Sequence, residues 1–266
     1  MSVDVAEPGK LDIGRVISGT FQTLGRNAVA FLVLALVLSG VPAALVSYIE
    51  AANLVGMRSG DMSLTMNYFS SLGLVGLVTV VSSAILQGAL IYGTVQDMNG
   101  RKPNIGECLA TGLRAFLPLI GVSILFGLAA AFGFVLLIVP GVMIICAWCV
   151  SVPSLVAERT GVFGAFSRSA DLTRGNRWRI FALLIVVWVI AIVISMVIGA
   201  IAVGASFMSG GLDPVALARS PAQIVANLIT STLSPAISST GVAVLYVELR
   251  RTREGLGPQW LAEIFN

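Results

Sequence analysis

Long apolar stretches alternate with short polar segments along this 266-residue chain. A helix needs roughly 20 mostly apolar residues to cross the hydrocarbon core of a bilayer. Six stretches come close to that length or exceed it: residues 28–49, 68–95, 116–138, 141–157, 180–207 and 223–247. The pattern therefore predicts an all-α fold, a polytopic membrane helical bundle with about six transmembrane helices.

The third and fourth stretches are separated by only four residues, Ile138-Val139-Pro140-Gly141. Proline removes a helical donor and glycine permits a tight reversal, so we expect a helical hairpin here. A single helix over residues 116–157 would instead be about 60 Å long, roughly twice the hydrocarbon thickness.

Apolar residues at helical spacing also precede the first, third and fifth stretches, within residues 13–24, 105–117 and 162–170. Such a helix, with one apolar and one basic face, is suited to the headgroup plane. We therefore expect three cytoplasmic, amphipathic interfacial helices, each leading into a two-helix hairpin. The corresponding repeat units would be residues 11–100, 103–160 and 161–254.

The composition excludes most soluble classes of protein. Hydrophobic residues make up 57% of the chain and charged residues 11%, whereas soluble domains carry about 25% charged residues. No segment between the apolar stretches is long enough for a separate core. We expect a single membrane domain over residues 1–266.

The basic residues predict the orientation. Of the 16 Lys and Arg residues, only Arg58 and Arg219 fall between the first and second or the fifth and sixth stretches. Because positive charge marks the cytoplasmic side, both termini should be cytoplasmic and the protein a multi-pass protein of the plasma membrane. The basic residues lie beside membrane spans, which favours anionic lipid headgroups and argues against nucleic acid as a partner.

Each returning helix ends on an acid that is followed by basic residues. Asp97, Glu158 and Glu248 occupy these positions. An acid at a helix C-terminus opposes the macrodipole unless a cation pairs with it, so surface ion pairs are expected. A charged vestibule for an ion or a lipid headgroup is the alternative. The candidate residues for lipid, partner or ion-pair contacts are Asp97, Glu158, Arg168, Arg174, Arg177 and Glu248.

The central region resembles the membrane-domain family of glycerophosphoryl diester phosphodiesterases and the related YciC-like membrane proteins. The resemblance covers about residues 135–190 and rests on these residues: Pro140-Gly141, Trp148, Pro153, Glu158, Gly161, Ala165-Phe166, Arg168-Ser169, Leu172-Thr173-Arg174-Gly175 and Trp178. It implies a membrane region and no catalysis, because a phosphodiesterase of that type needs a soluble barrel with catalytic His residues. This chain contains no His.

Polar residues gather in the sixth stretch and, less densely, in the second. Thr230 to Thr240 is rich in Ser and Thr, and the second stretch contains Gln87. Hydrogen bonding between packed helices explains such groups. The alternative is a polar path for a solute or a lipid headgroup, with Gln87, Ser234, Pro235 and Ser238 as its candidate residues.

Other chemistry has little support in the sequence. Cys146 and Cys149 have C-x-x-C spacing but lie in an apolar span, where Cys behaves as a small hydrophobe. We expect no metal, no cofactor and no catalytic residue; an enzyme would have only Glu158 and Arg168 as a nucleus. The leading hypothesis is a non-enzymatic membrane scaffold or accessory protein that engages anionic lipids or an unidentified protein partner. The alternative is a transporter or lipid-translocating protein.

Overall fold

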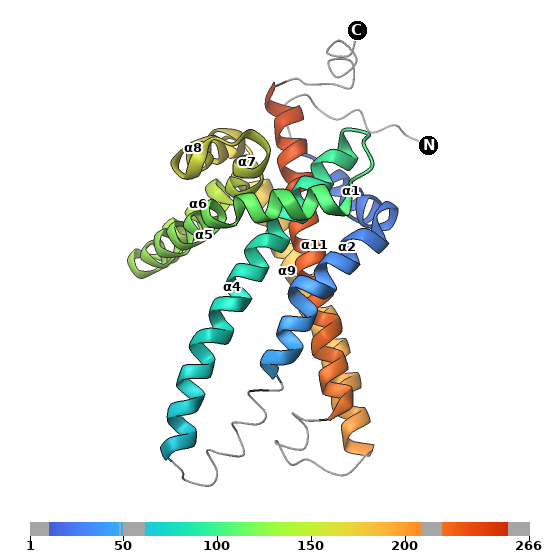
Figure 1. Ribbon diagram of the computed structural model, residues 1–266. Coiled ribbons are helices and arrows are strands. Elements are labelled where there is room, and N and C mark those ends of the chain that lie inside the picture. Colours follow the sequence, from blue (N-terminus) through green and yellow to red (C-terminus); the bar gives the residue numbers. More distant parts are fainter. Residues whose placement is uncertain (1–10, 48, 50–61, 209–219, 255–266) are drawn as a thin grey trace.

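The structure, a computed structural model, describes residues 11–47, 49, 62–208 and 220–254. Within these ranges the chain is all-helical, without a strand. Figure 1 shows four long segments, α2 with η1, α4, α9 and α11, running between the two ends of the molecule, with α1 and α8 gathered at one end.

The elements follow in this order: α1 (Ile13–Arg26), α2 (Ala28–Ala35), the π-helical turn η1 (Leu36–Gly40), α4 (Met62–Met98), α5 (Ile105–Leu136), α6 (Ile138–Trp148), α7 (Ser151–Glu158), α8 (Gly161–Thr173), α9 (Arg177–Met208) and α11 (Pro221–Glu254). Asp12 caps α1 by accepting a hydrogen bond from the Arg15 N–H, and Asn104 caps α5 in the same way through the Gly106 N–H.

Six helical segments in the described ranges are long and apolar enough to cross a membrane. They are Ala28–Ser47, Gly73–Met98, Ile105–Leu136, Ile138–Glu158, Arg177–Ser206 and Pro221–Glu254. Each overlaps one of the six predicted stretches, so the prediction of an all-α protein with six apolar spans is confirmed at this level. Arg58 and Arg219, on which the orientation partly rests, lie outside the described residues.

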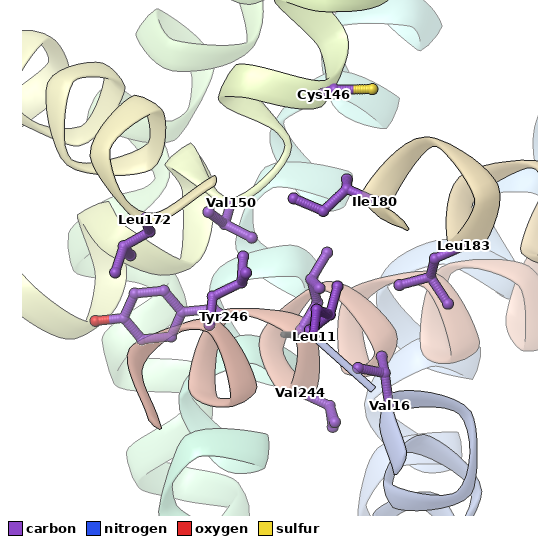
Figure 2. Packing of buried hydrophobic residues seen from close by; sticks show 11 residues of the cluster. Leu11, Val16, Cys146, Val150, Leu172, Ile180, Leu183, Val244 and Tyr246 are labelled. Atoms are coloured by element: carbon purple, nitrogen blue, oxygen red, sulfur yellow. The ribbon is translucent and has the colours of Figure 1, made fainter. Parts of the chain in front are cut away.

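The sixth span, α11, is the central helix. It packs against α1, α2, η1, α4, α7, α8 and α9. Leu245, Tyr246 and Leu249 of α11 are fully buried in a cluster with residues of α1, α6, α8 and α9. Figure 2 shows the Tyr246 ring within this cluster and its hydroxyl pointing out of it. Of the polar residues of the sixth span, Thr232, Ser239 and Thr240 are buried among the helices, whereas Ser234 and Ser238 are exposed.

The second predicted interfacial segment is not a separate helix. α5 runs without interruption from Ile105 to Leu136 and unites residues 105–117 with the third span. Gly112 explains why this segment stays beside α4. A Cβ atom at Gly112 would lie 2.3 Å from the Ile85 carbonyl oxygen, so only glycine allows α4 and α5 to approach this closely.

The turn between the third and fourth spans is shorter than predicted. α5 ends at Leu136, Leu137 has an extended backbone, and α6 begins at Ile138. Pro140 and Gly141 therefore lie in the first turn of α6. A Cβ atom at Gly133 would lie 2.9 Å from the Gly141 Cα, so Gly141 permits close helix packing rather than the reversal itself.

The fourth span is broken between α6 and α7. Pro153 cannot donate to the carbonyl of Cys149, and Val150 leaves the helical conformation. Two buried side chains of α8 satisfy the backbone groups at the break. The Ser169 hydroxyl donates to the Ala147 carbonyl at 2.8 Å and accepts from the Val150 N–H at 3.3 Å, and the Thr173 hydroxyl also donates to Ala147. α8 is thereby fixed against the broken span.

Candidate functional site

Five side chains from α7, α8 and α11 form what we call the charged cluster: Glu158, Arg168, Tyr246, Arg250 and Glu254. Glu158 reaches this position because α7 ends there, with Arg159 in a left-handed conformation that turns the chain towards α8. Arg168 lies in the second half of α8, which ends at Thr173. It precedes Ser169, whose hydroxyl donates to the Ala147 carbonyl of α6.

Glu158 is the centre of the charged cluster. The Arg168 Nε donates to both of its oxygens, at 2.9 and 2.8 Å, and the Tyr246 hydroxyl donates to one of them at 2.6 Å. Arg168 also pairs with Glu254, which in turn accepts from the Arg250 Nε at 3.0 Å. The two carboxylates and two guanidinium groups balance in charge, and they hold α7, α8 and α11 together.

The cluster keeps Arg168 charged. Partial burial alone would lower the pKa of Arg168, but its hydrogen bonds to Glu254 and Glu158 outweigh that effect and hold the pKa above its ordinary value. Arg168 is 28% exposed. The group is therefore a permanent cation that is committed to protein carboxylates.

The other two predicted acids also have protein partners. Asp97 pairs with Arg26 at 2.7 Å, which joins the end of α4 to the end of α1. Glu248, whose side chain is only 6% exposed, pairs with Arg251 at 3.1 Å and lies 3.7 Å from Arg15. The structure thus places all three acids in ion pairs with basic residues.

Arg174 and Arg177 lie apart from the charged cluster. Arg174 is exposed, and its backbone carbonyl accepts a hydrogen bond from Arg253. Arg177 is half-buried, and its Nε has no hydrogen-bond partner among the described residues. Trp178 beside it is 83% exposed. An exposed Trp next to arginines is typical of the interface between a membrane and water.

A cavity of about 1010 Å³ lies between α1, α4, α5, α9 and α11. Along α11 it extends from Thr230 to Leu245, which corresponds to about 22 Å of helix axis. All four predicted polar-path residues line it: Gln87 from α4, and Ser234, Pro235 and Ser238 from α11. The structure therefore brings together residues that are about 150 positions apart in the sequence.

The cavity wall is mainly aliphatic. Its apolar side chains come chiefly from α9 and α11: Leu183, Leu184, Val187, Ile190, Ile194, Ile198, Leu233, Ile237, Val242 and Leu245. The polar minority includes Ser83, Gln87, Ser123, Thr230, Ser234 and Ser238. No charged side chain belongs to the part of the wall that the described residues form.

Several polar groups in the wall, Gln87 and Ser234 among them, have no hydrogen-bond partner among the described residues. Neither the Gln87 amide nor the Ser234 hydroxyl makes a hydrogen bond to another described residue, whereas Ser238 donates weakly to the Pro235 carbonyl at 3.3 Å. An amide or hydroxyl without a partner in an apolar environment costs about 1–3 kcal/mol. Gln87 and Ser234 are therefore available to a polar group inside the cavity.

Several residues of these sites were not predicted from the sequence. Arg250, Glu254 and Tyr246 join the charged cluster, Ser123 adds a hydroxyl to the cavity, and Ser169 seals the broken span. Arg250 and Glu254 could have been recognised as an i,i+4 ion pair. The Ser123 hydroxyl carries no such signal, because it is a lone polar residue in an apolar stretch.

The described residues contain no group of three or more His, Cys, Asp or Glu side chains that could hold a metal ion. The charged cluster can fix helices relative to one another, and the cavity can hold an apolar molecule with a few hydrogen-bonding groups. These features define a multi-pass helical membrane protein.

The chain belongs to a family described as a domain of unknown function, DUF7847, which matches residues 50–249. The matched region includes α4 to α9 and most of α11. It contains Glu158, Arg168 and Tyr246 of the charged cluster but not Arg250 and Glu254, and it contains nearly all of the polar residues of the cavity wall. No curated protein and no solved structure matches the chain. The resemblance to the phosphodiesterase membrane domains stays a prediction.

Proposed function

We propose that this protein is a non-enzymatic membrane protein that binds one lipid-like molecule with an uncharged polar head in its cavity. The observation that carries the proposal is the apolar cavity lined by Gln87 and Ser234, whose hydrogen-bonding groups have no partner among the residues that the structure describes. This develops the lipid-handling alternative that the polar residues of the second and sixth spans suggested.

The wall chemistry favours a lipid over a polar solute. A path for an ion or a sugar would need polar groups along its whole length, whereas here aliphatic side chains dominate the wall. A charged head would need a counter-charge, because an isolated ion in an apolar cavity is far more costly than a neutral hydroxyl or carbonyl. Diacylglycerols, long-chain alcohols and isoprenoid alcohols have the required chemistry.

The charged cluster argues against catalysis. Glu158 and Arg168, the only catalytic nucleus that the sequence offered, are engaged with each other and with Tyr246 and Glu254. A general base must be free to take a proton from a substrate. We therefore assign this cluster a structural role.

Native mass spectrometry with lipid identification tests the proposal. The protein, reconstituted with equal amounts of diacylglycerol and phosphatidylglycerol, should retain one diacylglycerol in preference. Gln87→Leu should weaken retention about tenfold, which corresponds to about 1.4 kcal/mol for one hydrogen bond. Ser18→Ala is the control, since Ser18 is exposed and does not line the cavity. Equal retention by Gln87→Leu and the parent protein would refute the proposal.

A membrane scaffold that engages anionic lipids is a second candidate function. Its support is the exposed Trp178 beside Arg174 and Arg177, together with Phe163 at the start of α8, which is 80% exposed. Both termini would then be cytoplasmic, as the basic residues indicate.

Lipid selectivity at the protein surface distinguishes this second candidate. Arg174→Gln should lower the amount of phosphatidylglycerol that co-purifies, whereas Arg114→Gln should not, because Arg114 is exposed but has no neighbouring exposed Trp. An unchanged phosphatidylglycerol content in Arg174→Gln would contradict the role of this surface. A protein partner that co-purifies reproducibly with the parent protein and is lost in Arg174→Gln would support it.

A further inference from the structure

The hairpin of α5 and α6 differs from the other apolar segments in its direction. In Figure 1, α4, α9 and α11 continue to the end of the molecule opposite α8, whereas α5 and α6 extend to the side and their turn lies well short of that end. All six segments are apolar enough to cross a membrane. Composition therefore does not decide whether this hairpin crosses.

The length of α6 limits how far the hairpin can reach. α6 contains 11 residues between the turn at Leu137 and the break at Cys149, and so spans about 16 Å. The hydrocarbon core is about 30 Å thick. Between α6 and α7 the backbone of Val150 leaves the helical conformation, and after the break α7 packs against α8, α4 and α5. The unbroken helix of the returning arm is thus about half as long as a crossing requires, and the 21 residues of Ile138–Glu158 reach the full length only if α7 continues in the direction of α6.

The turn of the hairpin has no polar residue. Val135, Leu136, Leu137, Ile138 and Val139 are 58% to 83% exposed. No charged residue occurs between Arg114 and Glu158. The connections between the first and second spans and between the fifth and sixth spans, in contrast, contain Arg58, Asp61, Asp213 and Arg219. A turn that emerged into water would leave five large aliphatic side chains exposed to it.

The backbone of the turn is suited to hydrocarbon. The Leu137 N–H donates to the Gly133 carbonyl at 3.0 Å, and the Gly141 N–H donates to the Leu137 carbonyl at 3.4 Å. Pro140 has no N–H group, so the first turn of α6 has one unsatisfied donor fewer. Irregular backbone in a bilayer needs such internal partners.

We propose that α5 and α6 form a re-entrant hairpin, which enters the bilayer from the side of the charged cluster, contacts the acyl chains of one leaflet through Val135–Val139, and returns without crossing. The protein would then have four crossing segments and one embedded hairpin. This proposal is independent of the ligand in the cavity. It also keeps the predicted orientation, because both ends of the hairpin are on the same side in either arrangement.

Accessibility of single cysteines tests the proposal. In full-length protein with Cys108, Cys146 and Cys149 replaced by Ala, Leu137→Cys is compared with Arg58→Cys and Arg101→Cys in sealed vesicles of both orientations. A membrane-impermeant maleimide should label Arg58→Cys from one side and Arg101→Cys from the other. Leu137→Cys should be labelled from neither side, at less than a tenth of the control yield, and should react fully after denaturation in SDS.

Labelling of Leu137→Cys from the side that labels Arg58→Cys would overturn the proposal, because the hairpin would then cross the membrane. Labelling from the Arg101 side would also overturn it, since the hairpin would then lie on the surface. Val139→Cys provides a second position if Leu137→Cys does not fold. A fluorophore at either position should be quenched more by nitroxides on acyl chains than by nitroxides on headgroups; the reverse order would count against an embedded turn.

Discussion

The polar side chains of the charged cluster and those of the cavity differ in their hydrogen bonding. Glu158 accepts hydrogen bonds from both Arg168 and Tyr246, whereas Gln87 and Ser234 have no hydrogen-bond partner among the described residues. A polar group that costs stability and is not paired is useful only if something outside the protein pairs with it. The charged cluster therefore links α7, α8 and α11, and under the proposed function the cavity is the place for a ligand.

Replacing Arg168 with Ala should have the largest effect on stability. The change leaves Glu158 and Glu254 without a major partner, and we expect a loss of about 2 kcal/mol, less than for a fully buried pair because Arg168 is partly exposed. SDS titration of the protein in detergent measures the free energy of unfolding. Arg114→Ala, at an exposed position, should change it by less than about 0.5 kcal/mol. Equal losses of stability in Arg168→Ala and Arg114→Ala would show that the charged cluster contributes no more to stability than an exposed surface position.

Tyr246→Phe should lower the free energy of unfolding slightly less than Arg168→Ala. It removes only the hydroxyl that donates to Glu158 at 2.6 Å, and a hydrogen bond to a charged group contributes about 1.5 kcal/mol. Tyr92→Phe is the matched control, because its hydroxyl only accepts from the neutral Gln96 side chain of the same helix. The same titration should show a smaller loss for Tyr92→Phe. A larger loss at Tyr92 would mean that the charged cluster contributes little.

Ser169→Ala should destabilise the protein by about 1 kcal/mol, because the buried Val150 N–H loses its acceptor while Thr173 still donates to Ala147. Thermal unfolding in detergent is a suitable measurement, with Ser18→Ala as the control at an exposed hydroxyl. An unchanged midpoint in Ser169→Ala would show that the break in the fourth span does not depend on α8.

Gln87→Leu should have the smallest effect on stability and is the sharpest test of the comparison. Because the amide makes no hydrogen bond within the described part of the chain, its loss should change the free energy of unfolding by less than about 0.5 kcal/mol or increase it, while ligand retention falls. Gln96→Leu, on the same helix, removes the hydrogen bond to Tyr92 and should destabilise the protein. Clear destabilisation by Gln87→Leu in ligand-free protein would show that Gln87 is a structural residue.

Local sequence pattern was sufficient to predict the six apolar spans and the helices around Ile13–Arg26 and Gly161–Thr173. Twenty apolar residues in a row have few stable solutions other than a helix in hydrocarbon. The close acid and base in Glu158 and Arg168, only ten positions apart, could also be recognised as a candidate pair. The threefold repeat and the interfacial role of the amphipathic helices stay predictions.

Features that depend on contacts between distant residues could not be predicted in this way. Pro140-Gly141 predicted a reversal, but the chain reverses at Leu137 because Gly133 and Gly141 pack against each other. The break after Cys149 persists because a serine about 20 residues later satisfies its backbone. Neither partner is visible from the local pattern.

By itself, the sequence determined that the protein is an all-α membrane protein with six apolar spans, because hydrophobic length and charge are properties of each segment alone. The tertiary structure decided that Gln87 and Ser234 share one cavity, that Tyr246 and Glu254 complete the charged cluster, and that α5 and α6 turn aside from the other spans. These outcomes depend on which helices pack together, and close packing is set by the shapes of distant side chains and glycines rather than by hydrophobicity.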